Sequence, residues 1–165
     1  MWKENCMTGV RMDKQNKILK VIWWLYIILL FVFVVVKFKG SFYELSNRIN
    51  SYSMQGLINY NLVPFSSISV QIRRISQWWA LKNLLGNIIP FMPFGFLLPI
   101  AYKKFSSPIK VIGTGIVTIL FIELFQFFTK LGSFDIDDII LNMLGIICGY
   151  LIFVLIKHVA VKGEN

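Results

Sequence analysis

The sequence predicts an all-α polytopic membrane protein, a bundle of four transmembrane helices. Of its 165 residues, 56% are hydrophobic, and the mean hydropathy of +0.67 is too high for an ordinary soluble domain. Four apolar runs are each close to the roughly 20 helical residues that cross a bilayer core. Polar, charge-bearing segments separate these runs, as expected for the loops between spans. The runs are residues 18–36, 84–102, 109–128 and 139–156.

The four runs form one domain, residues 18–156, between two polar ends. Residues 1–17 are basic, but no small-residue cleavage site follows the first run, so we interpret this run as a retained helix rather than a signal peptide. Residues 157–165 form a short tail. Cys6 lies in the basic segment and Cys148 within an apolar run, which favours neither a disulfide nor a metal site.

The long connection between the first two runs, residues 37–82, contains two arginines and two tryptophans shortly before the second run. A basic stretch with tryptophans is typical of a helix that lies in the membrane interface, and we expect one around residues 68–82. A plain connecting loop with an aromatic belt explains the same composition. Within the second run, Pro90 and Pro93 predict a kinked helix, because proline removes a backbone donor.

The distribution of charge predicts the orientation in the membrane. The net charge is +9, from 17 Lys and Arg against 8 Asp and Glu, and the connection between the third and fourth runs contains only one cation, Lys130. Because cytoplasmic segments are rich in Lys and Arg, four crossings place both termini in the cytoplasm. The first connection contains six cations and fits less well, although long connections follow this rule less strictly. We expect this charge to meet anionic lipid rather than nucleic acid.

Three of the predicted spans contain polar side chains, which membrane helices rarely carry. A charged side chain costs roughly 3 kcal/mol at the bilayer centre, so it usually faces the interior of a bundle and marks a function. The predicted orientation places these polar residues at one depth, in the outer leaflet. We predict a ligand-binding pocket formed by Asn87, Glu123, Gln126, Asp138 and Asn142, with Asp135 and Asp137 at its mouth.

Three interpretations of this polar cluster stay open at the level of sequence. It can join helices through hydrogen bonds, as the pair Gly145 and Gly149 is expected to join them through close packing. It can bind a ligand. It can also be catalytic or bind a metal, with Glu123 and Asp138 as acid and base or as oxygen ligands. The chain has no phosphate-binding loop, Ser–His pair or His/Cys cluster, so we expect no cofactor and no metal.

Four motifs follow one another along the chain: Asn61-Leu-Val-Pro-Phe65, the run from Asn87 to Pro99, Glu123-Leu-Phe-Gln126, and Asp135 to Asn142 followed by Gly145 to Gly149. In this order they resemble the motifs of the VanZ-like family of membrane proteins. The resemblance covers residues 60–155, and Ser133 stands in the region where many members carry an arginine. It implies a multi-pass protein of the bacterial plasma membrane, related to resistance against teicoplanin, a lipid-bearing glycopeptide antibiotic that binds cell-wall precursors. It supplies no reaction, because no mechanism is established for the family.

We therefore expect a protein of the teicoplanin-resistance type that binds an amphiphile of the outer leaflet in the polar pocket. The ligand would be the antibiotic, a cell-wall precursor or a lipid head group. The alternative is a membrane-embedded enzyme that acts on a lipid or cell-envelope substrate with Glu123 and Asp138. A scaffold for a cell-wall enzyme is a third possibility, and a transporter is less expected because no inverted repeat is evident. The sequence does not determine the oligomeric state.

Overall fold

Four long apolar helices dominate the computed structural model, which describes residues 2–36, 60–129 and 131–163. Each is long and apolar enough to cross a membrane, and the first is the N-terminal helix. The prediction of an all-α protein with four membrane helices is confirmed. The spans are Asn16–Val34, Trp78–Ala101, Pro108–Phe128 and Ile136–Ala160.

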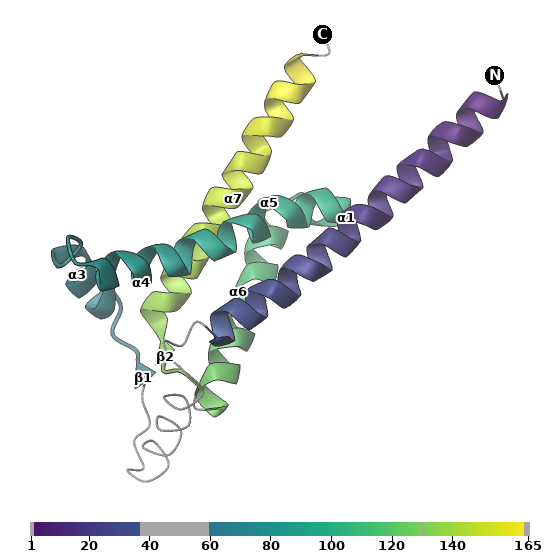
Figure 1. The fold of residues 1–165 in the computed structure, drawn as a ribbon. Helices are drawn as coiled ribbons and strands as arrows, with labels where there is room; N and C mark the ends of the chain where they lie inside the picture. The colour runs from purple at the N-terminus through teal and green to yellow at the C-terminus, as the bar shows by residue number, and fades with distance from the viewer. Residues whose placement is uncertain (1, 37–59, 130, 164–165) are drawn as a thin grey trace.

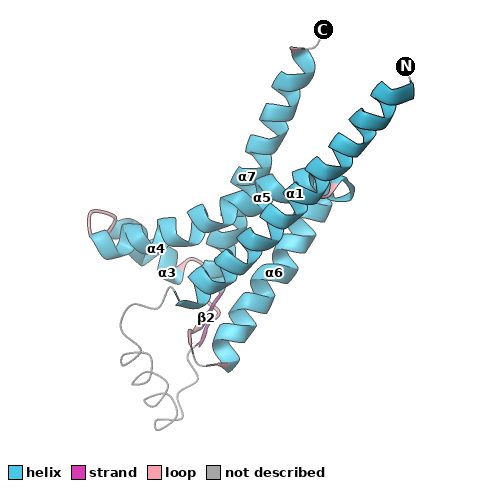
Figure 2. Ribbon diagram, turned by 45° about the vertical axis from the view of Figure 1, so that its right-hand side comes forward, coloured by secondary structure: helices cyan, strands magenta, loops and turns pink. Residues whose placement is uncertain are grey.

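The helices form a bundle whose two terminal helices, α1 and α7, point toward the same end of the molecule (Figure 1). Two very short strands, β1 and β2, lie at the opposite end, which we call the β1–β2 end (Figures 1 and 2). The elements are α1 (Trp2–Val36), β1 (Tyr60–Asn61), α3 (Ser66–Arg73), α4 (Trp78–Ile88), the 3-10 turn η1 (Ile89–Phe91), α5 (Met92–Ala101), the 3-10 turn η2 (Lys103–Phe105), α6 (Pro108–Phe128), β2 (Phe134–Asp135) and α7 (Ile136–Lys162).

The interfacial helix expected around residues 68–82 is instead two helices. α3 ends at Arg73, and the backbone turns before α4 begins at Trp78. The N–H of Gln77 donates to the backbone oxygen of Arg74 at 2.8 Å, which closes this turn. The second span therefore starts at Trp78 rather than at residue 84, and the two tryptophans belong to its first turn. The arginines and tryptophans that suggested one helix stand on opposite sides of this turn, because Arg73 ends α3 and Trp78 begins α4.

Proline interrupts the second span as predicted. The helix gives way to the 3-10 turn η1, which contains Pro90, before α5 resumes with Pro93 in its first turn. Proline supplies no N–H for the regular helical hydrogen bond. The hydroxyl of Tyr26 on α1 donates to the backbone oxygen of Pro90 at 2.8 Å. The interrupted backbone is thus tied to a neighbouring helix, as a membrane interior requires.

Glycines bring the second and fourth spans into direct backbone contact. A Cβ atom on Gly145 would lie 2.2 Å from the backbone oxygen of Ile88, and one on Gly149 would lie 1.8 Å from that of Met92. Gly95 on α5 makes the reciprocal approach, because its Cβ would lie 1.9 Å from the oxygen of Ile146. The expectation that Gly145 and Gly149 serve close helix packing is confirmed.

The turn between α5 and α6 lies beside α1 and α7. The indole N–H of Trp24 donates to the Tyr102 hydroxyl at 3.1 Å, and the Lys20 ammonium lies 5.7 Å from the centre of the same ring. The Tyr150 hydroxyl on α7 donates to the backbone oxygen of Ser106 at 2.8 Å. The turn thus lies on the side of the bundle toward which both termini point, where the sequence predicts cytoplasmic cations.

Candidate ligand-binding site at the β1–β2 end

The start of α7 is joined to the β1 segment by a short parallel pairing. Tyr60 pairs with Phe134 and Asn61 with Asp135. The Asp135 carboxylate caps α7 by accepting from the N–H of Asp137 at 2.9 Å. It also accepts from the Asn61 amide at 3.1 Å and from the Ser67 hydroxyl at 2.8 Å. Both oxygens of Asp135 are therefore engaged in holding β1 and α3 against α7.

Asp137 is completely buried and binds the start of α3. One oxygen accepts from the N–H of Phe65 at 2.6 Å. The other accepts from the N–H groups of Ser67 at 2.7 Å and Ile68 at 3.0 Å. The first N–H groups of a helix have no partner within it and carry partial positive charge, so a carboxylate is their natural acceptor. Phe65 has φ 64°, a left-handed conformation that is uncommon for a non-glycine residue and is fixed here by this contact.

Asn87 and Asp138 join the second and fourth spans. The Asn87 amide on α4 donates to an oxygen of the Asp138 carboxylate on α7. Asn87 is buried and Asp138 is partly buried. The two positions are 51 residues apart in sequence. The structure therefore brings together two of the predicted pocket residues from different helices.

The other three predicted pocket residues are buried inside the bundle. Glu123 and Asn142 are each only 2% exposed, and Gln126 is 7% exposed. The Gln126 amide donates to the backbone oxygen of Val34 at 3.0 Å and so joins α6 to the end of α1. The side-chain oxygen of Asn142 is buried and accepts no hydrogen bond from any residue that the structure describes. A buried acceptor without a donor costs about 1–3 kcal/mol, so Asn142 is where a donor from a ligand would be favourable.

The contacts thus divide the predicted site residues by what they bind. Asp135 and Asp137 bind the β1–α3 segment, and their position at the mouth of a pocket stays a prediction. Asn87, Asp138 and Asn142 lie between spans. Among the described parts of the chain, no three His, Cys, Asp or Glu side chains are grouped closely enough to hold a metal ion.

Sequence reasoning missed the partners of Asp135. Asn61 donates to the Ser66 hydroxyl at 2.7 Å and to the Ser67 hydroxyl at 3.1 Å as well as to Asp135. Its own side-chain oxygen accepts from the N–H of Val63 at 3.2 Å. This last contact is an Asx turn, a local motif that an Asn shortly before a proline can signal. Nothing local in the sequence signals the contact with Asp135.

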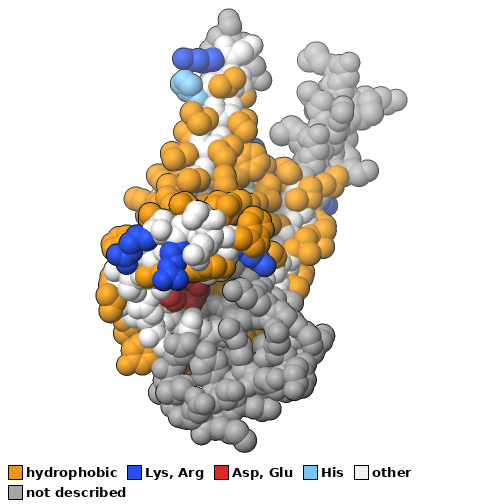
Figure 3. All heavy atoms as spheres, turned by 60° about the vertical axis from the view of Figure 1, so that its left-hand side comes forward, with side chains coloured by type: hydrophobic (Ala, Val, Ile, Leu, Met, Phe, Trp, Pro, Cys, Tyr) orange, Lys and Arg blue, Asp and Glu red, His pale blue; other side chains and the backbone are white. Residues whose placement is uncertain are grey.

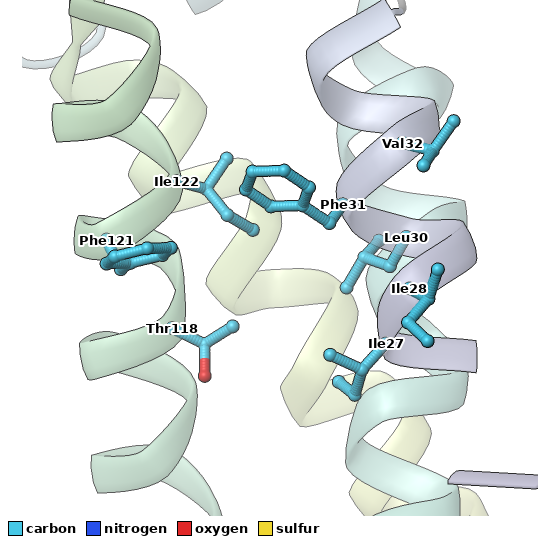
Figure 4. A pocket seen from close by; sticks show the side chains of 8 residues that line it. All are labelled: Ile27, Ile28, Leu30, Phe31, Val32, Thr118, Phe121 and Ile122. Carbon is cyan, nitrogen blue, oxygen red and sulfur yellow. The ribbon is translucent and has the colours of Figure 1, made fainter. Parts of the chain in front are cut away.

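An apolar groove of about 360 Å³ lies between α1 and α6. Figure 4 shows Phe31 and Ile122 pointing toward each other across it, with Thr118 and Phe121 on the α6 side. The Thr118 hydroxyl donates to the backbone oxygen of Thr114 at 2.9 Å, so its polar atom is bonded within α6. The groove therefore offers only hydrocarbon. On α6 it ends immediately before Glu123 in sequence.

Comparisons with known proteins show the family to which the sequence is similar. The model of the family described as VanZ/LLP1 matches residues 23–157. Protein VanZ of Enterococcus faecium is 28% identical over 99 residues, which cover 57% of this chain and 55% of that protein. The chain thus matches about half the length of this relative. No solved structure matches the chain.

Proposed function

We infer that this chain, which belongs to the VanZ/LLP1 family, binds the head group of an amphiphile from the outer leaflet of the bacterial plasma membrane. The family and the four apolar helices identify a membrane protein like those of teicoplanin resistance. The ligand, the outer-leaflet position and the cytoplasmic location of both termini are parts of our proposal. They rest on the polar residues at the β1–β2 end and on the charge pattern described above.

The observation that carries the proposal is the buried oxygen of Asn142, which lacks a donor among the described residues. Helix packing alone explains an amide that is fully hydrogen-bonded, but it does not explain an acceptor left empty. Asn142 lies one helical turn after Asp138, so the two share a face of α7. An ammonium or amide group of a ligand would give this face the donor that the described residues do not supply.

The other polar residues give the site its chemical preference. Glu123 and Asp138 would accept from ammonium or amide groups of the ligand. Asn87, Gln126 and Asn142 can both donate and accept. A site of this composition favours a head group rich in N–H and O–H groups, such as a glycopeptide or a cell-wall precursor.

The groove between α1 and α6 supports an amphiphile rather than a wholly polar ligand. Its volume of about 360 Å³ lies within the range of about 300–1,000 Å³ found for small-molecule sites. Ile122, part of its wall, directly precedes Glu123. An alkyl chain in the groove would leave its head group close to the buried polar residues. Sequestering the antibiotic or masking its target are both ways in which such binding would lower drug action.

Teicoplanin susceptibility tests this proposal in a host that lacks relatives of the protein. We compare wild type, Glu123→Gln, Asp138→Asn and Asn142→Leu at equal membrane levels. Thr114→Val is the matched control, because the Thr114 hydroxyl bonds within its own helix, to Lys110 at 2.8 Å. We expect wild type and the control to protect, and each site variant to lose about tenfold in protection, equivalent to about 1.4 kcal/mol of binding.

Two results would contradict the proposal in different ways. If all three site variants protect like wild type, the polar residues serve helix packing. If wild type does not protect, teicoplanin is not the ligand and the resistance function is wrong for this chain. If protection requires a divalent ion and this requirement disappears in Glu123→Gln, the result would instead favour the membrane-embedded enzyme. Thermal unfolding of each purified variant in detergent separates loss of function from loss of fold.

A further inference from the structure

We propose that a second site, on the α3–α4 side of the molecule, binds the phosphate head group of an anionic membrane lipid. Its charge comes from Arg73, Arg74 and Lys82, all of them exposed. Its apolar part is a groove between α4 and the end of α1. This site is separate from the polar pocket, whose carboxylates suit donors rather than anions, so either site can be wrong without the other.

Two of the three cations, Arg73 and Arg74, stand at the turn between α3 and α4, and Lys82 follows on α4. Arg73 ends α3, Arg74 follows it, and the hydrogen bond from Gln77 to Arg74 folds the chain directly into α4. Lys82 comes one turn after Trp78, on the same face of α4. Figure 3 shows blue basic side chains gathered over this part of the molecule, beside hydrophobic surface. Within the described residues, no carboxylate forms an ion pair with any of the three.

The groove that Lys82 lines is formed mostly by apolar side chains, as a hydrocarbon chain requires. It has a volume of about 270 Å³, with Phe33 of α1 on one side. On the other side, Trp78, Lys82 and Leu85 are spaced by four and three residues and so follow one face of α4, and Ile89 continues the lining at the start of η1. Lys82 is the only charged residue in the lining. Its methylene stem can cover apolar surface while its ammonium reaches the head-group region.

The location of these cations needs a specific explanation. Lys20 lies beside the α5–α6 turn, at the end of the bundle toward which both termini point. Along α1, roughly 20 Å of helix, at 1.5 Å per residue, separates Lys20 from Phe33. Lys and Arg gather on the cytoplasmic side of membrane proteins. This preference accounts for cations at the end of the bundle toward which both termini point. Lys82 lines the same groove as Phe33 and therefore lies away from that end, and the arginines precede it across the α3–α4 turn. A bound phosphate explains them, because arginine matches its oxygens with a planar fork of donors and lysine adds a point charge.

The nearby carboxylates do not compete for this role. Asp135 and Asp137 accept hydrogen bonds from β1 and α3, and Asp138 accepts one from Asn87. Their charge is therefore directed into the protein. The occupant that fits both parts of the site is a lipid with an alkyl chain in the groove and an anionic phosphate beside the arginines.

Tryptophan fluorescence measures occupancy of this groove, because Trp78 lines it and is 75% exposed. The full chain is reconstituted in phosphatidylcholine vesicles that contain increasing fractions of phosphatidylglycerol or phosphatidylcholine with brominated chains, which quench tryptophan on contact. The quenching lost in Trp78→Phe is the signal from the groove. We expect half-quenching at a roughly tenfold lower fraction of brominated phosphatidylglycerol than of brominated phosphatidylcholine, a preference of about 1.4 kcal/mol.

Charge-matched variants decide whether the preference belongs to this site. The double variant Arg73→Gln with Arg74→Gln, and the single variant Lys82→Gln, should bring the two half-quenching fractions to within about twofold. The control, Lys103→Gln with Lys104→Gln, removes the same charge as the arginine pair and should keep the tenfold preference. Equal quenching by both lipids in wild type would overturn the proposal. So would a control that loses the preference as fully as the arginine pair, because that result indicates only net charge.

Discussion

The middle of α7 and its first turn hold the bundle together by opposite means. In the middle, Gly145 and Gly149 let α7 approach the backbone oxygens of Ile88 and Met92, on either side of η1. In the first turn, Asp135, Asp137 and Asp138 reach out to three other segments through hydrogen bonds. The glycine contact has one arrangement and no room for a ligand. The polar turn consists of hydrogen bonds, and one helical turn beyond it lies the Asn142 oxygen, which accepts from no residue in the described part of the chain.

This difference follows from the membrane as a solvent. Apolar surface gains little by moving from lipid into a helix contact, so association depends on close packing and on polar contacts between helices. The glycine contact relies on close packing, and the start of α7 relies on polar contacts between helices. A binding site is therefore expected where polar contacts predominate, and the glycine contact is expected to give that site a rigid support.

Filling the glycine contact should have the largest effect. Gly149→Leu places a side chain where Cβ alone would lie 1.8 Å from the Met92 oxygen. Backbone cannot move aside as a flexible side chain does, so we expect a cost of about 3 kcal/mol or more. The measurement is the yield of monodisperse protein in detergent and its thermal unfolding midpoint.

The matched control is Gly113→Leu, because nothing lies within 4 Å of a Cβ atom at Gly113 on α6. Both changes replace a glycine in a helix by the same residue, so the helix propensity gained is the same. Gly113→Leu should leave the unfolding midpoint unchanged or higher. Equal stability of the two variants would show that α5 and α7 do not meet through glycine backbone.

Removing the charge of Asp137 should have a smaller and more local effect. Asp137→Asn keeps the shape of the side chain but turns an N–H₂ group toward backbone donors of α3. We expect a loss of about 2–3 kcal/mol, the usual value for a buried hydrogen bond to a charged group. Because α3 is held through this carboxylate, limited proteolysis should cut near residues 66–77 faster than in wild type.

Asp135→Asn is the comparison for this prediction. Asparagine caps a helix about as well as aspartate, so we expect a loss under about 1 kcal/mol and little change in proteolysis. Should Asp135→Asn open α3 to protease as fast as Asp137→Asn does, the three N–H groups that bind Asp137 are not the main attachment of α3.

The sequence predicted those features that depend on neighbours along one helix. Hydrophobic length located four spans, spacing placed Gly145 and Gly149 on one face, and polar residues inside apolar runs marked positions that the structure finds buried. It did not predict the break between α3 and α4 or the role of Asp137. Phe65 and its acceptor Asp137 are 72 residues apart, and periodicity carries no information about which distant segment meets which carboxylate. Asp137 therefore looked like a loop residue free to face a ligand.

The smallest predicted effect concerns the contact that joins α1 to the interrupted span. Tyr26→Phe removes the hydroxyl that donates to Pro90 and leaves the ring in place. We expect a loss of about 1 kcal/mol and a fall in the unfolding midpoint of about 2–4 °C for a chain of this size. Tyr60→Phe, at a side chain 58% exposed, should change stability by less than about 0.5 kcal/mol. If both variants unfold at the wild-type temperature, η1 is held by the glycine contact alone, and the attachment of α1 adds nothing to the rigid support of the site.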